Sequence, residues 1–313
     1  MDFKQFRYFV AVADELHMGR AAEKIGVAQP ALSQQIKLLE HQLKTPLFYR
    51  EKRGIRLTEA GEEFLAHARA ALKQANMAME RGRRAGAGEV GRLKFGYVPS
   101  VVYCPVFRRI LMDFRKTHPD VDVSFFAAHP NDLVRDLEQD LIDVAIVRAP
   151  LLRMSSELTV EAVSSERLVV AMPHTHRLAN MGVIAPEALA NEDITTTLDL
   201  DGIGLAGILS TMFGEAGIPV KISRRTAVAS EMTALVACGF GIAVVPASLG
   251  KTPHEGVVVR PLDSEVETSI VLIRRTNEKR AVPRAFLESH RRIVAEASLE
   301  KADAGKRNPP LVA

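Results

Sequence analysis

Four polar side chains with hydrogen-bonding ends recur within a short stretch near the N-terminus. They are Gln29, Ser33, Gln34 and Lys37, and their spacing brings them to one face of a helix. Side chains of these types donate to and accept from base edges, and a lysine ammonium can meet a phosphate. This chemistry predicts recognition of a nucleic acid by a helix surface.

The elements around these side chains must hold that helix in place. A helix beginning at Gln29-Pro30 is expected because proline is tolerated at the first helical position, where its missing N–H would have no partner. Its opposite face carries the apolar stripe Leu32, Ile36, Leu39 and Leu43. A short helical run at 19–25 precedes it and stops at a glycine. The pair predicts a helix-turn-helix; the alternative is a helical hairpin whose polar face is merely solvated.

A basic hairpin follows this pair. Residues 47–50 and 54–57 form two strand-like runs around a tip that contains Lys52 and Arg53. Such a hairpin could act as a wing that contacts phosphates or the minor groove. Residues 1–94 carry 17 Lys and Arg against 11 Asp and Glu, whereas residues 95–313 carry 24 against 27. The basic excess therefore lies in the part expected to meet a polyanion.

The stretches RYFVAVADE, RAAEKIGVAQPALSQQIKLLEHQL and PLFYREKRGIRLTEAG resemble the N-terminal signature of LysR-type transcriptional regulators over about the first 65 residues. The resemblance implies promoter DNA as the partner of a winged helix-turn-helix domain at 1–58. It places the family's DNA contacts on Gln29, Pro30, Ser33, Gln34, Lys37 and Arg53. One departure is His17-Met18-Gly19, where the family usually carries a Ser/Thr-containing stretch; losing a hydroxyl cap costs about 1 kcal/mol.

Residues 59–90 are predicted to form a long linker helix and hinge. Small and apolar residues recur along it at steps of three and four, as in a helix–helix seam. The candidate dimerisation residues are Phe64, Ala68, Ala71, Leu72, Ala75 and Met79. The resemblance implies that this helix pairs two protomers, giving a homodimer or homotetramer. Glycines at 82, 86, 88 and 91 are expected to mark the hinge.

The remainder of the chain alternates strand-like and helix-like runs, which predicts an α/β fold with parallel strands. Two such cycles indicate two lobes, lobe I at about 91–162 plus 267–300 and lobe II at about 163–266. The resemblance implies a two-lobed, Rossmann-like effector-binding domain at 91–300, similar to type 2 periplasmic binding proteins. Residues 301–313 are expected to be a disordered tail.

Small ligands of α/β domains bind at the carboxyl ends of strands. Polar residues at the expected strand ends are therefore candidates for an anionic effector, although each could equally be a structural cap. They are Ser100, His129, Arg148, Thr196, Thr197 and Asp199, and we add Gly202 from the glycine-rich turn that follows the last of these strands. The runs GYVPS and VVPAS are similar to regulators that respond to aromatic acids or muconates, whereas His129-Pro130 departs from that subgroup.

The sequence gives little support to other classes of function. We see no HExxH, GxSxG, P-loop or strand-following GxGxxG, and His174 with His176 lacks further metal ligands, so we expect neither an enzyme nor a cofactor. The absence of a long apolar run and of a signal-peptide pattern predicts a cytoplasmic protein without membrane contact, and argues against an exported solute-binding protein. RNA polymerase is a candidate further partner.

The two cysteines leave one alternative open. Cys104 opens an expected helix, where a thiol can have a lowered pKa, so a redox-sensing regulator is the rival interpretation. Cys238 lies in an apolar run and is expected to be buried and inert.

Overall fold

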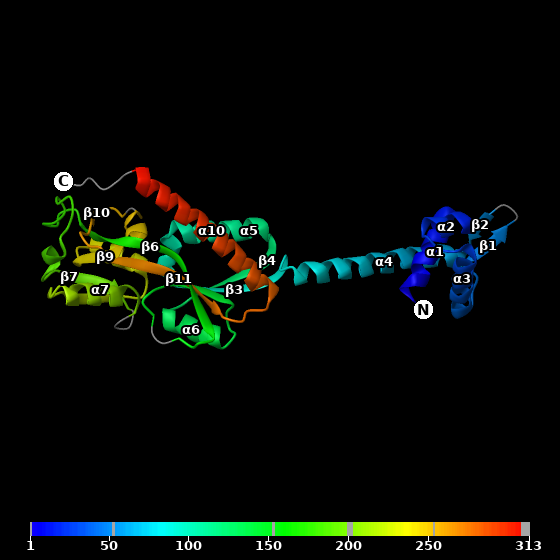
Figure 1. Cartoon of the computed structure of the whole chain (residues 1–313), viewed down its shortest axis with the longest axis horizontal. Coiled ribbons are helices and arrows are strands. Elements are labelled where there is room, and N and C mark those ends of the chain that lie inside the picture. The colour runs from blue at the N-terminus through cyan, green and yellow to red at the C-terminus, as the bar shows by residue number, and fades with distance from the viewer. Residues whose placement is uncertain (1, 52–53, 152–153, 199–202, 253, 308–313) are drawn as a thin grey trace. The chain divides into compact units, whose positions relative to one another are not determined.

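The computed structural model describes residues 2–51, 54–151, 154–198, 203–252 and 254–307 (Figure 1). The chain divides into two compact units, residues 1–84 and residues 85–313. No helix within the described residues is both long enough and apolar enough to cross a membrane.

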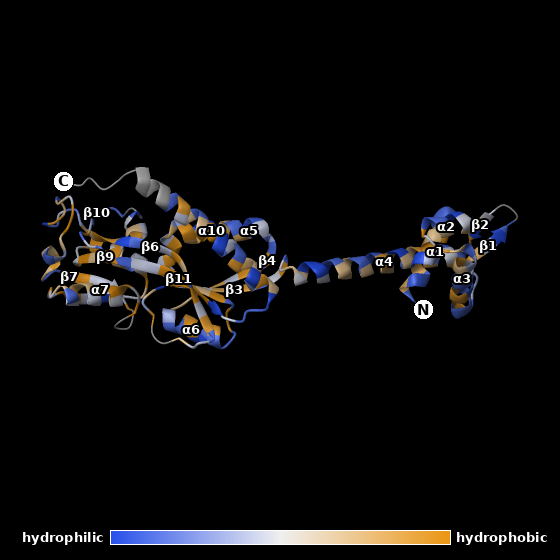
Figure 2. Ribbon diagram, in the orientation of Figure 1, coloured by the Kyte–Doolittle hydropathy of each residue, from blue (hydrophilic) through white to orange (hydrophobic). Residues whose placement is uncertain are grey.

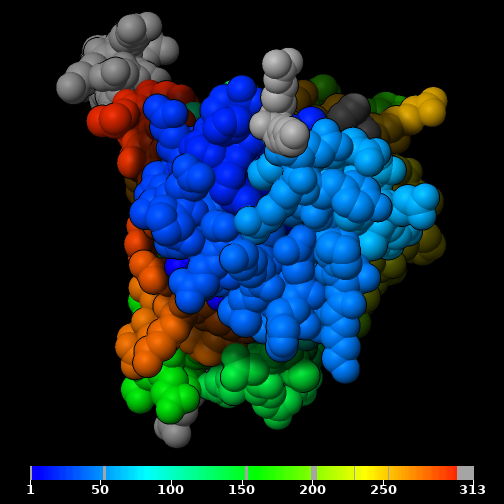
Figure 3. Space-filling model, turned by 90° about the vertical axis from the view of Figure 1, so that its right-hand side faces the viewer, coloured from blue at the N-terminus to red at the C-terminus, as the bar shows by residue number. Residues whose placement is uncertain are grey.

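The first unit is built on three short helices and a hairpin. The helices are α1 (Phe3–Glu15), α2 (Met18–Lys24) and α3 (Gln29–Leu43), and the hairpin strands are β1 (Phe48–Glu51) and β2 (Gly54–Leu57). The expected stripe of α3 is confirmed, because Leu32, Ile36 and Leu39 are fully buried. They pack with Phe9 of α1 in one apolar core, whose shell includes Leu43. Figure 3 looks onto this unit, whose atoms are in shades of blue.

The long helix α4 (Glu59–Gly86) begins directly after the hairpin. The Thr58 hydroxyl accepts a hydrogen bond from the Gly61 amide at 2.9 Å and donates to the Pro46 carbonyl at 2.8 Å, so it caps the helix and ties it to the preceding loop. The helix extends into the stretch that was expected to be the hinge. Gly82 and Gly86 lie within it, and Gly88 and Gly91 follow it with positive φ, conformations that glycine adopts readily.

The second unit contains one mixed sheet in the order β4-β3-β5-β11-β6-β9-β7-β8, with β10 paired to β6. Parallel pairing holds at the two ends, between β3 and its neighbours and between β7 and its neighbours. The strands are β3 (Val90–Tyr97), β4 (Asp120–Ala127), β5 (Val144–Arg148), β6 (Leu158–Pro173), β7 (Asp193–Thr197), β8 (Lys221–Thr226), β9 (Ile242–Pro246), β10 (Val257–Pro261) and β11 (Glu267–Arg275).

Helices cover this sheet. They are α5 (Pro105–Thr117), α6 (Pro130–Glu138), α7 (Gly204–Glu215), α8 (Ala229–Ala237), α9 (Ala247–Gly250) and α10 (Ala281–Arg307), with 3-10 helices η1 (Pro99–Tyr103) and η2 (Pro186–Leu189). Figure 2 shows apolar colours on the strands between them. The buried residues form two separate cores, one around Phe95 and Phe286 and the other around Met172 and Phe213, which define the two lobes.

Strand β6 connects the lobes. Its residues up to Arg167 pair antiparallel with β11, and its residues from Leu168 pair with β9. The change of partner therefore falls between residues 167 and 168, whereas the sequence suggested a boundary near 163. The expectation of a parallel sheet needs correction at the centre, where β11 pairs antiparallel with β5 and β6, and β6 pairs antiparallel with β9 and β10.

The C-terminus also differs from expectation. Helix α10 extends to Arg307, so residues 301–307, expected to be disordered, are helical. The remaining tail residues lie outside the part of the chain that the structure describes.

Candidate DNA-binding face and effector pocket

Helix α3 presents the polar face that the sequence predicted. Gln29, Pro30, Gln34 and Lys37 are exposed, and Ser33 is half-buried. These side chains lie opposite the buried stripe that fixes the helix to the core, so the face is held in a defined orientation. The wing candidates Lys52 and Arg53 lie outside the described residues. Their flanking strands pair in a regular antiparallel register from Phe48–Leu57 to Glu51–Gly54.

The cap of α2 is a histidine. The His17 ring Nδ1 accepts hydrogen bonds from the Gly19 and Arg20 amides at 3.2 and 3.3 Å. The expected loss of a cap is therefore wrong, because the imidazole takes the place of the missing hydroxyl. The helix that supports α3 thus has a satisfied N-terminus.

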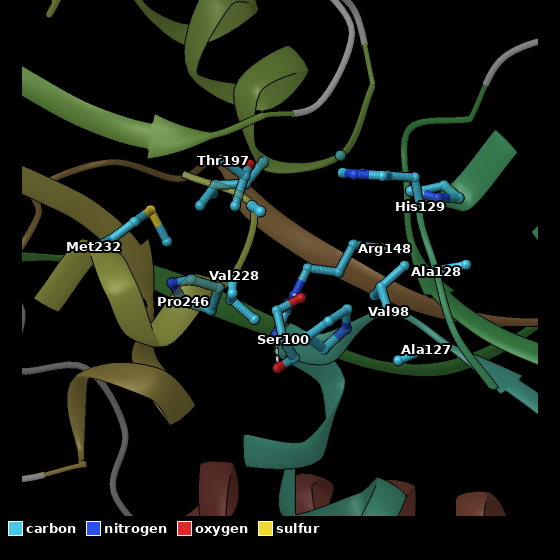
Figure 4. Close-up of a pocket in the computed structure, with 15 residues that line it drawn as sticks. Val98, Ser100, Ala127, Ala128, His129, Arg148, Thr197, Val228, Met232 and Pro246 are labelled. Atoms are coloured by element: carbon cyan, nitrogen blue, oxygen red, sulfur yellow. Dashed lines mark hydrogen bonds between the residues drawn. The ribbon is translucent and has the colours of Figure 1, made fainter. Parts of the chain in front are cut away.

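A pocket of about 300 Å³ opens between the two lobes of the second unit (Figure 4). We call it the interlobe pocket. Most of its wall is apolar, and its polar side chains are Ser100, His129, Arg148 and Thr197. The apolar part of the wall includes Val98, Ala127, Ala128, Leu205, Val228, Met232 and Pro246. An apolar wall with a few convergent polar groups is typical of a small-molecule site.

Arg148 organises the polar end of this pocket, although it is only 3% exposed. Its guanidinium donates from Nε to Ser100 Oγ at 2.9 Å and from Nη2 to Glu166 Oε1 at 2.8 Å. A further bond reaches Thr268 Oγ1 at 3.3 Å. Glu166 Oε2 in turn accepts from the Ser248 amide at 2.8 Å, which links lobe I, the connecting strand and lobe II.

This hydrogen-bond network determines the charge balance of the pocket. The charge of Arg148 is balanced by Glu166, whose side chain is 14% exposed, so both charges are paired and hydrogen-bonded as burial requires. Sequence reasoning found Arg148 and Ser100 from their places at strand ends. It missed Glu166, because a carboxylate in the middle of a long strand gives no pattern that points to a site.

Four of the seven candidate effector residues meet in the pocket, namely Ser100, His129, Arg148 and Thr197. His129 does not end the strand before it, as expected, but is the N-cap residue of α6. Thr196 is 1% exposed and does not line this pocket, because successive strand residues point to opposite faces. Asp199 and Gly202 lie outside the described residues.

The candidate dimerisation residues separate into two groups. Phe64 and Ala68 pack against the helix-turn-helix core of their own chain, with the Phe64 ring 4.9 Å from that of Phe9. Ala71, Leu72 and Ala75 are half-buried, and Met79 is exposed. The second group leaves an apolar stripe on α4 that a second helix could cover.

The two cysteines differ in exposure. Cys104 is 3% exposed, within the core of lobe I, whereas Cys238 is exposed at the end of α8. The expectation that Cys238 is buried is therefore wrong. A buried Cys104 thiol gives the redox interpretation no support, since a sensor thiol has to be reached by its oxidant.

Comparison with known proteins identifies the two domains that contain these sites. The family model described as the LysR substrate binding domain matches residues 86–294, and the model of the bacterial regulatory helix-turn-helix protein, lysR family, matches residues 3–62. The fold and these matches define a transcriptional regulator with a DNA-binding and an effector-binding domain. The chain belongs to the LysR family.

Two relatives are similar over nearly the whole chain. The HTH-type transcriptional regulator AlsR of Bacillus subtilis (strain 168) is 31% identical over 313 residues, covering 97% of this chain and 100% of AlsR. The crystal structure of CbnR, a LysR family transcriptional regulator, has a TM-score of 0.84 at 27% identity and covers 93% of this chain and 100% of its own. Full-length CbnR complexed with its target DNA has a TM-score of 0.82.

Proposed function

We propose that this regulator binds a small organic acid in the interlobe pocket and that the bound acid modulates its promoter binding. The observation that carries the proposal is the pocket itself, with a mostly apolar wall in which Ser100 and Arg148 form a hydrogen-bonded polar pair. A molecule with a compact apolar body, such as an aromatic ring, fits the wall, and an acid group fits the polar end.

The charge balance of the pocket restricts the acid. Because Glu166 already pairs with Arg148 at 2.8 Å, an effector carboxylate must share the guanidinium with Glu166. A second carboxylate would lack a cationic partner among the described lining residues unless His129 is protonated. A monoanion is therefore favoured over a dianion.

We further propose that the protein acts as a homo-oligomer on DNA in the cytoplasm. The exposed stripe of α4 supports self-association, since an apolar helix face lowers its free energy when a second helix covers it. Two α3 helices in a symmetric dimer read half-sites separated by whole helical turns, so the promoter site is an imperfect palindrome. RNA polymerase is the partner through which a bound regulator would act on transcription.

Thermal unfolding of the full chain with benzoate, muconate and benzamide tests the proposed ligand class. A ligand that binds only the folded protein stabilises it by about 2.7 kcal/mol at a hundredfold excess over Kd. We expect a concentration-dependent rise in Tm with benzoate, less with the dianion muconate, and none with the neutral benzamide. A Ser100→Ala variant, which removes a polar group of the pocket, should reduce the benzoate effect.

Two results would contradict the proposal. No stabilisation by any monoanion of this size would remove the organic acid as the effector class. Equal stabilisation of wild type and Ser100→Ala would place the binding site elsewhere.

A further inference from the structure

Lobe II contains a second pocket, which opens on the other side of β7 from the interlobe pocket. We call it the α7 pocket. Its volume is about 370 Å³, and it lies between α7, β7 and β8, of which α7 and β7 lie side by side in Figure 1. Its wall includes Thr196 of β7, Arg225 of β8, and Leu209, Ser210 and Phe213 of α7.

One buried polar atom in this wall lacks a hydrogen-bond partner among the described residues. Among the described residues the Thr196 hydroxyl has no hydrogen-bond partner, and Thr196 is 1% exposed. The neighbouring buried threonines are satisfied, since Thr195 donates to the Phe240 carbonyl and Thr226 to the Val228 carbonyl. A buried hydroxyl without a hydrogen bond destabilises a protein compared with a valine of the same shape. We therefore expect the Thr196 hydroxyl to have a hydrogen-bond partner.

Thr196 belongs to the wall of the α7 pocket. The register between β7 and β8 shifts between Ile194 and Thr195, where Ser223 is left without an opposite residue. Such bulges re-aim the side chains that follow them and are common beside functional sites. On β7 itself, successive residues point to opposite faces of the strand, so Thr196 lines the α7 pocket and Thr197 lines the interlobe pocket.

We propose that the α7 pocket is a second small-molecule site, distinct from the interlobe pocket. Its ligand is a compact, mostly apolar molecule with one neutral hydrogen-bonding group, such as a phenol, whose hydroxyl pairs with Thr196. The apolar body contacts Leu209 and Phe213, which are buried on the inner face of α7.

The two sites share their supporting elements. The first residues of α7, Gly204 and Leu205, line the interlobe pocket, and the following turns of the same helix line the α7 pocket. A ligand that shifts α7 away from β7 changes the wall of the interlobe pocket as well. The α7 pocket thus supplies a route by which a second compound alters effector binding.

Binding of p-cresol and toluene to the full chain, measured by ligand-observed NMR titration, tests this site. The two probes share an apolar body and differ by the hydroxyl. Three variants serve as comparisons: Thr196→Val removes the hydroxyl at constant shape, Thr196→Ser keeps it, and Ser210→Trp covers the exposed rim. We expect p-cresol to bind with a Kd in about the millimolar range. Thr196→Val should weaken p-cresol about fivefold and leave toluene unchanged, and Ser210→Trp should abolish binding of both.

Retention of p-cresol affinity in Thr196→Ser supports the assignment of the hydroxyl. The proposal is overturned if p-cresol does not bind the wild type, or if its affinity is unchanged in Thr196→Val and in Ser210→Trp. In either case the interlobe pocket and its organic acid are unaffected, because their readout is the Tm response of Ser100→Ala.

Discussion

The exposed face of α3 makes a prediction that separates base recognition from phosphate attraction. Gln29 and Ser33 are expected to contact base edges, so Gln29→Ala with Ser33→Ala should reduce discrimination between the promoter site and altered sites by about 1–3 kcal/mol per contact. Lys37→Ala should instead weaken all sequences and lower the slope of log K against log salt by about one. Titrations at several salt concentrations measure both. An unchanged footprint and preference in the double variant would show that these side chains do not read the site.

The Arg148–Glu166 pair permits a second prediction for single residues. Each charge is buried and depends on the other, so Arg148→Met or Glu166→Leu alone should destabilise the protein by about 3–5 kcal/mol. The double variant leaves no unpaired charge. Its loss of stability should therefore be smaller than the sum of the losses in the two single variants. Denaturant unfolding of all four proteins completes the cycle. Additive losses would mean that the pair is not energetically coupled.

Single residues also show where sequence reasoning fails. The apolar stripe of α3 follows from periodicity, and the strand-end positions of Ser100 and Arg148 follow from the α/β pattern. The bulge at Ser223, after which Arg225 lies opposite Thr196, could not be predicted, because it depends on the pairing of β7 with β8. The exposure of Cys238 depends on where α8 ends, and His17 acts as a cap through a side chain outside the usual capping set.

The junction between hairpin and linker helix makes a prediction for α4 as an element. A Cβ on Gly61 would lie 2.1 Å from the Leu47 carbonyl oxygen, whereas a Cβ on Gly82 would meet no heavy atom within 4 Å. Gly61→Ala should therefore displace α4 from the residue that precedes the hairpin and lower the free energy of unfolding by about 1–3 kcal/mol. Gly82→Ala, in the same helix, should stabilise it by about 0.5–1 kcal/mol. Thermal unfolding compares them, and a neutral Gly61→Ala would show that α4 does not pack closely against the loop.

The turn between β11 and α10 should give lobe I an acid-sensitive stability. Burial would raise the pKa of Glu278, but hydrogen bonds from Arg280 and Arg275 lower it from 4.5 to about 2. A carboxyl group whose pKa is lowered in the folded protein stabilises the fold at pH values above its pKa in the unfolded chain. This stabilisation is lost as the pH falls from about 4.5 to about 2. Glu278→Gln should therefore lower the free energy of unfolding by on the order of 2 kcal/mol at pH 7 and change it little near pH 2. Glu288→Gln, at an exposed position of α10, is the control, and an equal loss at both pH values would contradict the assignment.

At the level of elements, the parallel strands and their helices could be predicted because buried apolar runs alternate with amphipathic ones. The strands β10 and β11 were missed, although β11 contains the run Ile270–Ile273, buried throughout. Its partner residues in β5 and β6 lie a hundred residues or more earlier in the chain. Pairings of this range leave no local pattern in the sequence, and for that reason the antiparallel centre of the sheet emerged only from the structure.

For the whole molecule, the proposed effector and the DNA are linked ligands of one protein. If an acid in the interlobe pocket favours one DNA-bound arrangement by about 1–3 kcal/mol, promoter affinity should change by about 5- to 150-fold at saturation. Linkage requires that promoter DNA change the affinity for the acid by the same factor. Titrating DNA with and without the acid, and the acid with and without DNA, measures both sides of the cycle. Ser100→Ala should bind promoter DNA as the acid-free wild type does and respond less to the acid. If the acid raises Tm while DNA affinity and footprint stay constant, the interlobe pocket binds a ligand that does not regulate DNA binding.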